Sequence, residues 1–206
     1  MLIRCSSLDD LMTKPRSGGG LSATAKGVIE KLAIESRFAT PILFGNKYTK
    51  KGIECENDSI ELFNTVFFKN LKKNDVRLSN DYITGECDLI DGDTIIDIKT
   101  SWDIKSFASQ MLTPTVYEWQ LRGYMWLYDK DKACTVHCLV DTPTHLCQFD
   151  DGVHEFEHIP MTDRIIVGNV VKRDAEKEQE LINKIELARA YYQEVLDKLT
   201  QKGRLP

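Results

Sequence analysis

Residues 85–99 read GECDLIDGDTIIDIK, and this stretch decides the fold of the chain. A strand rich in apolar residues is followed by an Asp-Gly-Asp turn and by a second strand of Thr, Ile and Asp. This order predicts a tight β-hairpin with a two-residue loop. The loop falls at either residues 91–92 or residues 92–93, and both registers give the same alternation of side chains.

Three charged side chains of this hairpin fall on one face. Asp88 and Asp97 lie on the same side of the sheet, because side chains alternate along a strand with a period of two. Lys99 shares that face, whereas Ile96 and Ile98 point the other way, into a core. Burying two carboxylates together is costly unless a cation neutralises them. The hairpin therefore predicts a site that binds a metal ion.

The composition is that of an ordinary globular protein. The chain has 206 residues, of which 42% are hydrophobic and 29% charged, which is enough for one domain with a substantial core. No apolar run approaches the ~20 residues that a membrane span needs, and the start lacks a secretory pattern. We therefore expect a cytoplasmic protein with no membrane partner.

The net charge of −5 excludes a protein covered in basic surface, but it is compatible with local contacts to nucleic acid. Basic residues gather at 14–16, at 47–51 and at 69–77. A solvated face explains the second and third clusters equally well.

Apolar periodicity places helices and further strands along the rest of the chain. The expected helices cover about 8–12, 22–38, 52–69, 116–128 and 174–202. Alternation predicts strands at 133–140, 144–149 and 164–171 and a shorter piece at 154–158, and 101–107 is interpreted as a polar connection. The fold class is therefore α/β (α+β), with a central mixed sheet, flanking helices and a long C-terminal helix.

Two of these helices carry polar residues in notable positions. Glu56 falls on the apolar stripe that includes Ile60 and Phe67, so its carboxylate needs a partner. Gln120 and Tyr124 are four residues apart and project from one face of their helix. A surface glutamine beside a packing tyrosine is the alternative for the second pair.

The N-terminal segment combines a short helix with a basic, glycine-rich loop. Ser6 or Ser7 can cap the helix, and a helix N-terminus can also hold a phosphate. Lys14 and Arg16 begin the loop, which is either a plain flexible linker or a mobile arm that touches a DNA backbone, since arginine suits phosphates.

Four motifs resemble those of the PD-(D/E)xK nucleases, in particular the phage lambda exonuclease, YqaJ and RecE group, and they match in order along the chain. They span residues 6–124, and the downstream strands and long helix fit only loosely. Lambda exonuclease also carries an earlier basic residue for which Arg4 is the substitute here, so this departure leaves the 5′-phosphate preference open. The matches are Gly52 with Glu56 (G-x-x-x-E), Asp88 with Asp97-Ile98-Lys99 (D…(D/E)-x-K), Gln120 with Tyr124 (Q-x-x-x-Y), and Ser6 with Arg16 (the phosphate-contacting segment).

The resemblance implies a restriction-endonuclease-like core within a single nuclease domain over residues 1–206. A DNA-contacting segment would occupy residues 1–21, the catalytic core about 22–171 and the C-terminal helix about 174–202.

The resemblance also implies a division of roles among the site residues. One or two Mg²⁺ ions, replaceable by Mn²⁺, would bind to hard oxygen ligands. Lys99 would hold or deprotonate the attacking water, and Gln120 and Tyr124 would position that lysine or the backbone. The implied metal ligands are Glu56, Asp88, Asp97 and the Ile98 carbonyl, and the implied phosphate contacts are Arg4, Ser6, Lys14 and Arg16.

The activity that the resemblance implies is a metal-dependent DNA exonuclease of phage type. It would degrade linear double-stranded DNA from its ends in the 5′→3′ direction and pass the remaining strand to a single-strand annealing protein for recombination. The group also implies a ring-shaped trimer, and the location would be the host cytoplasm if a phage encodes the chain.

Two other functions fit parts of the sequence. An iron–sulfur nuclease of the Cas4 or AddB type would hold its cluster through Cys5 and later cysteines, but the expected tight grouping of cysteines is missing. A non-catalytic DNA-binding or assembly protein would keep the fold with a vestigial site, but the intact set of acids and lysine argues against it.

The six cysteines include no CxxC pair and predict reduced, mostly buried thiols. A zinc site could use the cysteines and histidines between residues 137 and 158, but their spacing matches no standard finger. Scattered core thiols and surface histidines are the simpler interpretation.

Overall fold

The predicted hairpin forms in this computed structural model, which describes residues 1–42, 45–147 and 153–201. Strand β4 (Leu89–Asp91) pairs antiparallel with β5 (Thr94–Thr100), and Asp91 lies opposite Thr94. The loop is therefore Gly92-Asp93, the second of the two predicted registers. Gly92 has a φ of 59°, a conformation that glycine adopts without a steric penalty.

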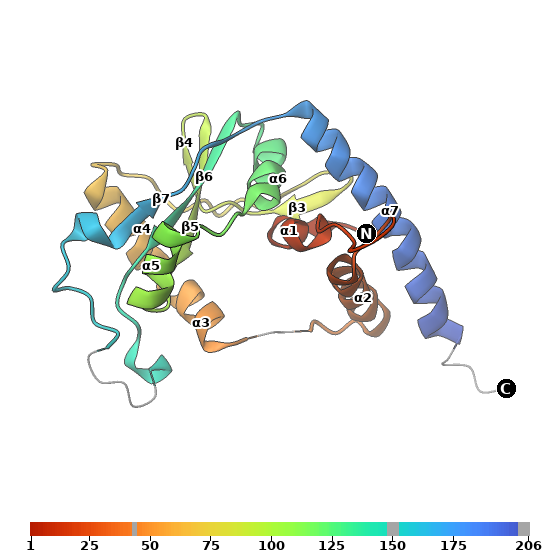
Figure 1. Cartoon of the computed structure of the whole chain (residues 1–206), viewed down its shortest axis with the longest axis horizontal. Coiled ribbons are helices and arrows are strands. Elements are labelled where there is room, and N and C mark those ends of the chain that lie inside the picture. Colours follow the sequence, from red (N-terminus) through yellow and green to blue (C-terminus); the bar gives the residue numbers. More distant parts are fainter. Residues whose placement is uncertain (43–44, 148–152, 202–206) are drawn as a thin grey trace.

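The hairpin is part of a five-stranded mixed sheet (Figure 1). Strand β5 pairs in parallel with β6 (Lys132–Cys138), which pairs antiparallel with both β7 (Ile165–Val167) and β8 (Val171–Lys172). The predicted strand over 164–171 is thus two short strands, and both contact the same partner.

Apolar cores cover both faces of this sheet. Alternate residues of β4 and β5 face helix α4 on one side and helices α1 and α6 on the other, as the period of two requires. The first core includes Phe63, Leu89, Ile96, Ile98 and Val136. The second includes Leu8, Ile95, Leu121, Met125 and Ala133.

A second, three-stranded sheet was not predicted. Its strands are β1 (Ile3–Arg4), β2 (Leu78–Ser79) and β3 (Ile83–Gly85), and β3 lies in the middle, parallel to β1 and antiparallel to β2. This sheet fixes the start of the chain beside the segment that leads into the hairpin.

The N- and C-terminal helices agree with the periodicity. The 3₁₀ turn η1 (Cys5–Ser7) leads into α1 (Leu8–Leu11), and Ser7 makes no side-chain capping bond. Helix α2 (Ala23–Phe38) begins at the predicted cap, because Ser22 Oγ accepts a hydrogen bond from Ala25 N at 2.9 Å. Helix α7 (Ala175–Gln201) packs along α2 (Figure 1), and Lys202 of its predicted range lies outside the described residues.

The predicted helix over 52–69 is wrong in its bounds. Two helices, α3 (Lys47–Glu54) and α4 (Glu56–Val66), meet at Cys55, whose φ of −101° and ψ of 13° interrupt the helical geometry. Asn46 begins α3, since its side chain accepts a hydrogen bond from Thr49 N. Phe67 lies beyond α4 and is 39% exposed, so it is not part of a buried stripe.

The polar connection predicted at 101–107 includes the start of a helix instead. Helix α5 (Ile104–Leu112) starts with a capping box in which Asp103 and Ser106 bond each other's backbone N–H groups. Helix α6 (Glu118–Tyr128) follows, close to its predicted range.

Two predicted strands after β6 are absent from the described residues. Residues 144–146 form a 3₁₀ turn, η2 (Thr144–Leu146), and residues 148–149 of that prediction lie outside the described ranges. Residues 154–158 are turns, followed by η3 (Met161–Arg164).

The predicted mixed α/β architecture with a central mixed sheet and a long C-terminal helix is confirmed. Within the described ranges, no helix combines the length and the apolar character of a membrane span.

Candidate active site

A hydrogen-bonded network joins β5 to α6. Lys99 Nζ lies 2.8 Å from Asp97 Oδ2 and 3.3 Å from Gln120 Oε1. The Gln120 amide closes the network, because Nε2 donates to Asp97 Oδ1 and to the Tyr124 hydroxyl, both at 3.1 Å. Four of the predicted site residues are therefore brought together by two elements. Strand β5 carries the ion pair of Asp97 and Lys99, and helix α6 carries Gln120 and Tyr124.

Asp88 lies immediately before β4 and opposite Asp97 if the register is extended by one residue. Its Oδ2 accepts a hydrogen bond from Ile98 N at 2.6 Å, which ties the carboxylate to the strand that carries the other acid. The predicted shared face of the two acids follows from this register.

Burial dominates the electrostatics of the two acids. Burial, together with the nearby charge of Asp97, raises the pKa of Asp88 to about 7. Burial also raises the pKa of Asp97, against the opposing charge of Lys99. Burial acts to lower the pKa of Lys99, but the attraction of Asp97, together with smaller contributions from Tyr117 and Asp88, outweighs it and the net shift is upward. The lysine is therefore charged at neutral pH, and it supplies part of the neutralisation that the acids require.

These residues line a cleft of about 600 Å³. Helix α3 and Trp102 form one wall, and α6 forms another. Glu56, Asp88, Asp97, Lys99, Gln120 and Tyr124 all contribute to its lining.

Lys51 of α3 bonds this helix to Trp102 and so holds one wall of the cleft together. This role was not recognised from the sequence. Lys51 belongs to the basic cluster at 47–51, for which a solvated face was one of two interpretations, yet it is fully buried and donates a hydrogen bond from Nζ to Trp102 O at 2.9 Å. Burial lowers its pKa to about 8. Thr142 donates to the same carbonyl at 3.3 Å, so the Trp102 backbone joins three segments of the chain.

Tyr117 and His137 are two further residues of the cleft that sequence reasoning missed. Lys99 Nζ lies 4.5 Å from the centroid of the Tyr117 ring, a cation–π distance. His137 lies opposite Lys99 in the β5–β6 register, and its ring centroid is 6.1 Å from that of Tyr117. Burial, together with the charge of Lys99, lowers the pKa of His137 to about 4, so the imidazole is neutral at pH 7. Spacing was a usable signal for Tyr117, which precedes Gln120 by three residues.

Asp9 anchors the start of α6 from a distant part of the chain. Its carboxylate accepts hydrogen bonds from Trp119 N at 3.0 Å and Gln120 N at 3.1 Å. It thus caps the helix that carries Gln120 and Tyr124. No sequence signal identifies this cap, because Asp9 belongs to α1, more than a hundred residues earlier.

Close packing beneath α6 depends on two glycines. A Cβ added at Gly85 would lie 2.6 Å from Cys5 Sγ and 2.8 Å from the Tyr124 ring, and one at Gly123 would lie 2.6 Å from Leu8. The missing side chains allow Tyr124 to approach β3, and Cys5 to approach both β3 and α6. The position of Tyr124 in the cleft therefore depends on Gly85.

Glu56 lines the cleft from α4, and its charge acts on both Asp88 and Asp97. It is the first residue of α4, and Lys73 Nζ lies 2.8 Å from its Oε2. The partner that the sequence analysis required for this carboxylate is therefore a lysine.

The donor set suits a hard divalent cation. Asp97 Oδ2 is buried and accepts no hydrogen bond from the described residues, its contact with Lys99 being an ion pair alone. As the side chains stand, no three His, Cys, Asp or Glu residues of the described chain are grouped closely enough to hold a metal ion. The carboxylates of Asp88 and Asp97 fit the chemistry of Mg²⁺ or Mn²⁺, and Glu56 can join them through Oε2 only by leaving Lys73.

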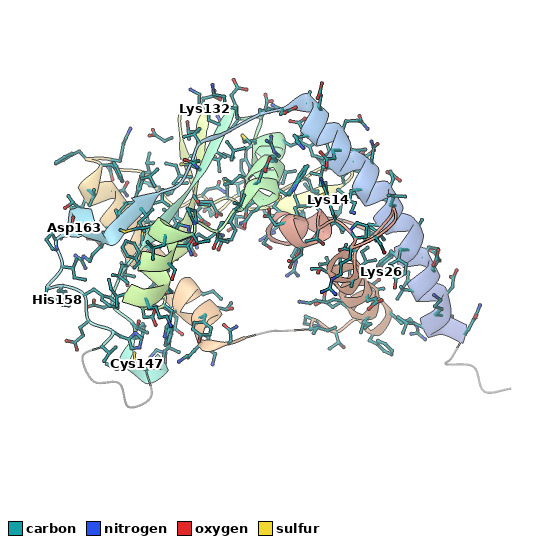
Figure 2. All side chains as sticks on the ribbon, in the orientation of Figure 1. Lys14, Lys26, Lys132, Cys147, His158 and Asp163 are labelled. Carbon is teal, nitrogen blue, oxygen red and sulfur yellow. The ribbon has the colours of Figure 1, made fainter. Side chains whose placement is uncertain are left out.

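The predicted phosphate contacts separate into two groups. Arg4 and Ser6 line a second pocket of about 550 Å³ together with Arg77, and Tyr124 lines both this pocket and the main cleft. Lys14 and Arg16 are exposed on the loop after α1 and line neither space. Figure 2 shows Lys14 beside α1, on the side toward α7.

The cysteines offer no cluster among the described residues. Cys5, Cys55, Cys87, Cys134 and Cys138 are free and buried, and Cys147 is free and half-buried. Cys147 and His158 lie on separate stretches of chain in Figure 2. Neither the iron–sulfur nor the zinc hypothesis gains support from this arrangement.

Comparison with protein-family models and with curated proteins gives no match. Solved structures do match the chain. A phage-related exonuclease from Haemophilus somnus 129PT is 35% identical, with a TM-score of 0.80 over 99% of this chain and 97% of that chain. The alkaline exonuclease LHK-Exo from Laribacter hongkongensis is 14% identical, and its complex with dAMP 15%; each has a TM-score of 0.72 over 98% of this chain and 92% of that chain. The two LHK-Exo structures show a shared fold.

Proposed function

The chain belongs to the phage-related exonucleases of the lambda exonuclease group, and from this premise we propose that it is a metal-dependent DNA exonuclease. The observation that carries the proposal is the network of Asp97, Lys99 and Gln120 in one cleft, with Asp88 bonded to the same strand. A buried and a half-buried acid beside a charged lysine are the groups that phosphodiester hydrolysis with a divalent cation requires.

The acids provide the binding site for the cation. Asp88, Asp97 and the Ile98 carbonyl would hold one or two Mg²⁺ ions, or Mn²⁺ in their place, and Glu56 would complete the set from α4. When bound, such an ion polarises a phosphate and lowers the pKa of a water molecule. Burial first, and the repulsion between neighbouring acids second, raise the pKa values of Asp88 and Asp97, and this positive charge would relieve both.

Lys99 is the group that acts on the reacting atoms. Its ammonium would hold the attacking water against the phosphate and offset negative charge in the transition state. The ion pair with Asp97 and the hydrogen bond to Gln120 fix the position of Nζ before substrate enters. The Tyr124 hydroxyl supports Gln120, and burial raises the Tyr124 pKa, so this hydroxyl remains protonated.

The substrate would be the end of linear double-stranded DNA, degraded in the 5′→3′ direction. The pocket of Arg4, Ser6 and Arg77 supports this polarity, because it adjoins the cleft at Tyr124 and offers two guanidinium groups to a terminal phosphate. Lys14 and Arg16 would contact the DNA backbone farther from the cleft. LHK-Exo has been solved with a nucleotide, dAMP, the kind of product that we propose here.

The biological role would be recombination. Membership of the lambda exonuclease group supports the transfer of the remaining strand to a single-strand annealing protein and a ring-shaped trimer. The annealing protein and the trimer rest on that membership alone.

The proposed activity is tested with end-labelled substrates. With Mg²⁺, the protein should release nucleotides from linear duplex DNA and leave a closed circle of the same sequence intact. With Ca²⁺, it should bind DNA without turnover, because Ca²⁺ prefers longer and more flexible coordination than Mg²⁺. A 5′-phosphorylated end should be degraded faster than a 5′-hydroxyl end. Equal cleavage of the circle would contradict an exonuclease, and no release under any of these conditions would contradict the enzyme.

A further inference from the structure

The segment after α4 contributes basic side chains to the region around the hairpin. Three of them, at intervals of four residues, each form an ion pair with an acid. We call residues 69–77 the basic segment. The pairs are Lys69 with Asp91 at 2.8 Å, Lys73 with Glu56 at 2.8 Å and Arg77 with Glu86 at 3.4 Å.

Asn74 fixes the middle of the basic segment against the hairpin. Its backbone N donates to Asp88 O at 2.8 Å, and its side-chain Nδ2 donates to Cys87 O at 3.0 Å. The same Nδ2 also lies 3.1 Å from the Tyr128 hydroxyl. The backbone beside Lys73 is therefore held next to Asp88, so the position of the lysine does not depend on its own ion pair.

Lys73 and Glu56 form the middle pair, and both retain access to solvent. Their side chains are 44% and 21% exposed. Other acids of the site also act on the Lys73 ammonium, since Asp88 and Glu86 lie near enough to add to the attraction of Glu56. Lys73 thus adds a positive charge at the edge of the acid set.

We propose that Lys73 sets the affinity of the site for divalent cations by competing for Glu56. The inference rests on the proposed function, which assigns Glu56 to the metal-binding set. Lys73 Nζ occupies Glu56 Oε2 at 2.8 Å, and a cation shared with Asp88 and Asp97 that takes this oxygen, alone or together with Oε1, must displace the ammonium. Ligation through Oε2 therefore breaks the ion pair, and cation binding is then weaker by the free energy of that pair.

The size of the effect follows from the exposure of the pair. An exposed ion pair stabilises by little, and its removal should change the cation dissociation constant by about 2–5-fold. Loss of a positive charge beside the acids acts in the same direction. Lys73→Gln should therefore bind Mn²⁺ more tightly than the wild type, whereas Lys73→Arg should resemble the wild type, because arginine can restore the pair.

The experiment measures Mn²⁺ binding without DNA, by calorimetry or by the loss of the free-ion signal in electron paramagnetic resonance. Lys72→Gln is the matched control, since Lys72 is the exposed neighbour and the charge change is identical. Glu56→Gln should weaken Mn²⁺ binding, and adding Lys73→Gln to it should then give a smaller gain than in the wild type, because only the loss of the lysine's charge remains. Thermal unfolding of each variant shows whether the fold is intact.

The outcomes are distinct. A 2–5-fold gain in Lys73→Gln that is absent from Lys72→Gln and smaller in the Glu56→Gln background supports the competition. Unchanged or weaker binding in Lys73→Gln overturns it, and so does a gain of equal size in Lys72→Gln or in the Glu56→Gln background. Asp88→Asn separates the two levels: if it leaves Mn²⁺ binding as in the wild type, the proposed metal site itself is wrong.

Discussion

The two sides of the candidate site are built in opposite ways. On the α6 side, Asp97, Lys99 and Gln120 are bonded to one another and are largely buried. On the α4 side, Glu56 makes one ion pair with a lysine whose side chain is 44% exposed. The α6 side is therefore positioned by the fold, whereas the α4 side can rearrange at little cost.

The difference has an energetic origin. Buried polar groups strengthen one another in a low dielectric, and breaking one bond leaves the rest unsatisfied. An exposed ion pair contributes only about 0–1 kcal/mol. Substitutions on the α6 side should therefore lower turnover at any metal concentration, and those on the α4 side should change the metal concentration that turnover requires.

Gln120→Ala should have the largest effect among the residues that support the lysine. It removes the bonds to Lys99, Asp97 and Tyr124 together, and a misplaced catalytic group can cost about 10²-fold in rate. The measurement is kcat on linear duplex DNA at saturating Mg²⁺. Recovery of wild-type kcat by added Mg²⁺ would mean that Gln120 acts only on metal binding.

Glu56→Gln should act through the metal. The Mg²⁺ concentration for half-maximal activity should rise by about 10–100-fold, the range found for groups that merely orient a ligand. Titrating Mg²⁺ at fixed DNA gives this midpoint, with Glu61→Gln as an exposed control on the same helix. The contrast between the two sides fails if Glu56→Gln lowers the plateau and leaves the midpoint unchanged.

Tyr117→Leu should lower kcat by about 2–30-fold, because it removes a partly desolvated cation–π contact worth about 0.5–2 kcal/mol. Tyr117→Phe keeps the ring and should lose much less. In a Lys99→Ala background, Tyr117→Leu should have no further effect, since the cation is gone. A full additional loss in that background would show that Tyr117 acts on something other than the lysine.

Asp88→Asn should alter stability in a pH-dependent way. The pKa of Asp88 is about 7 in the folded chain against an ordinary 3.8, so the folded state binds the extra proton between pH 4 and 7. The stability that this extra proton contributes is therefore lost as pH rises through this window. With EDTA present, the variant should gain Tm on the wild type from pH 5 to pH 8, at about 2–4 °C per kcal/mol. A difference in Tm that is constant with pH would rule out the raised pKa.

The hairpin and the long helices could be predicted because their signals are local and repeated. Asp88, Asp97 and Lys99 follow from a period of two across a tight turn, and α7 follows from seven apolar positions at helical spacing. The fold class and the family followed from these elements and from the motifs.

Other elements had signals that were overlooked. Asn46 marks the start of α3, and Asp103 with Ser106 forms the capping box of α5. The break at Cys55 has no comparable signal, since neither glycine nor proline occurs there. The second sheet was beyond prediction for another reason, because strands of two or three residues are too short to show alternation.

The remaining parts of the site depend on tertiary contacts. Asp9 reaches α6, Lys73 reaches Glu56 and Lys51 reaches Trp102 only once the chain has folded. The apolar stripe predicted around Glu56 correctly indicated that the carboxylate needs a partner. It did not indicate which residue that partner is. Sequence periodicity identifies a face, and only the packed structure identifies what meets it.

The single-turnover rate of nucleotide release from an end-labelled linear duplex, with saturating Mg²⁺, tests the central claim most directly. Lys99→Ala should lower this rate by about 10²–10⁴-fold while DNA binding in Ca²⁺ is retained. The control is Lys132→Ala, an exposed lysine at the opposite end of the β5–β6 pair (Figure 2), which should behave as the wild type. Wild-type release by Lys99→Ala, or an equal loss in both variants, would contradict the assignment of this network as the catalytic site.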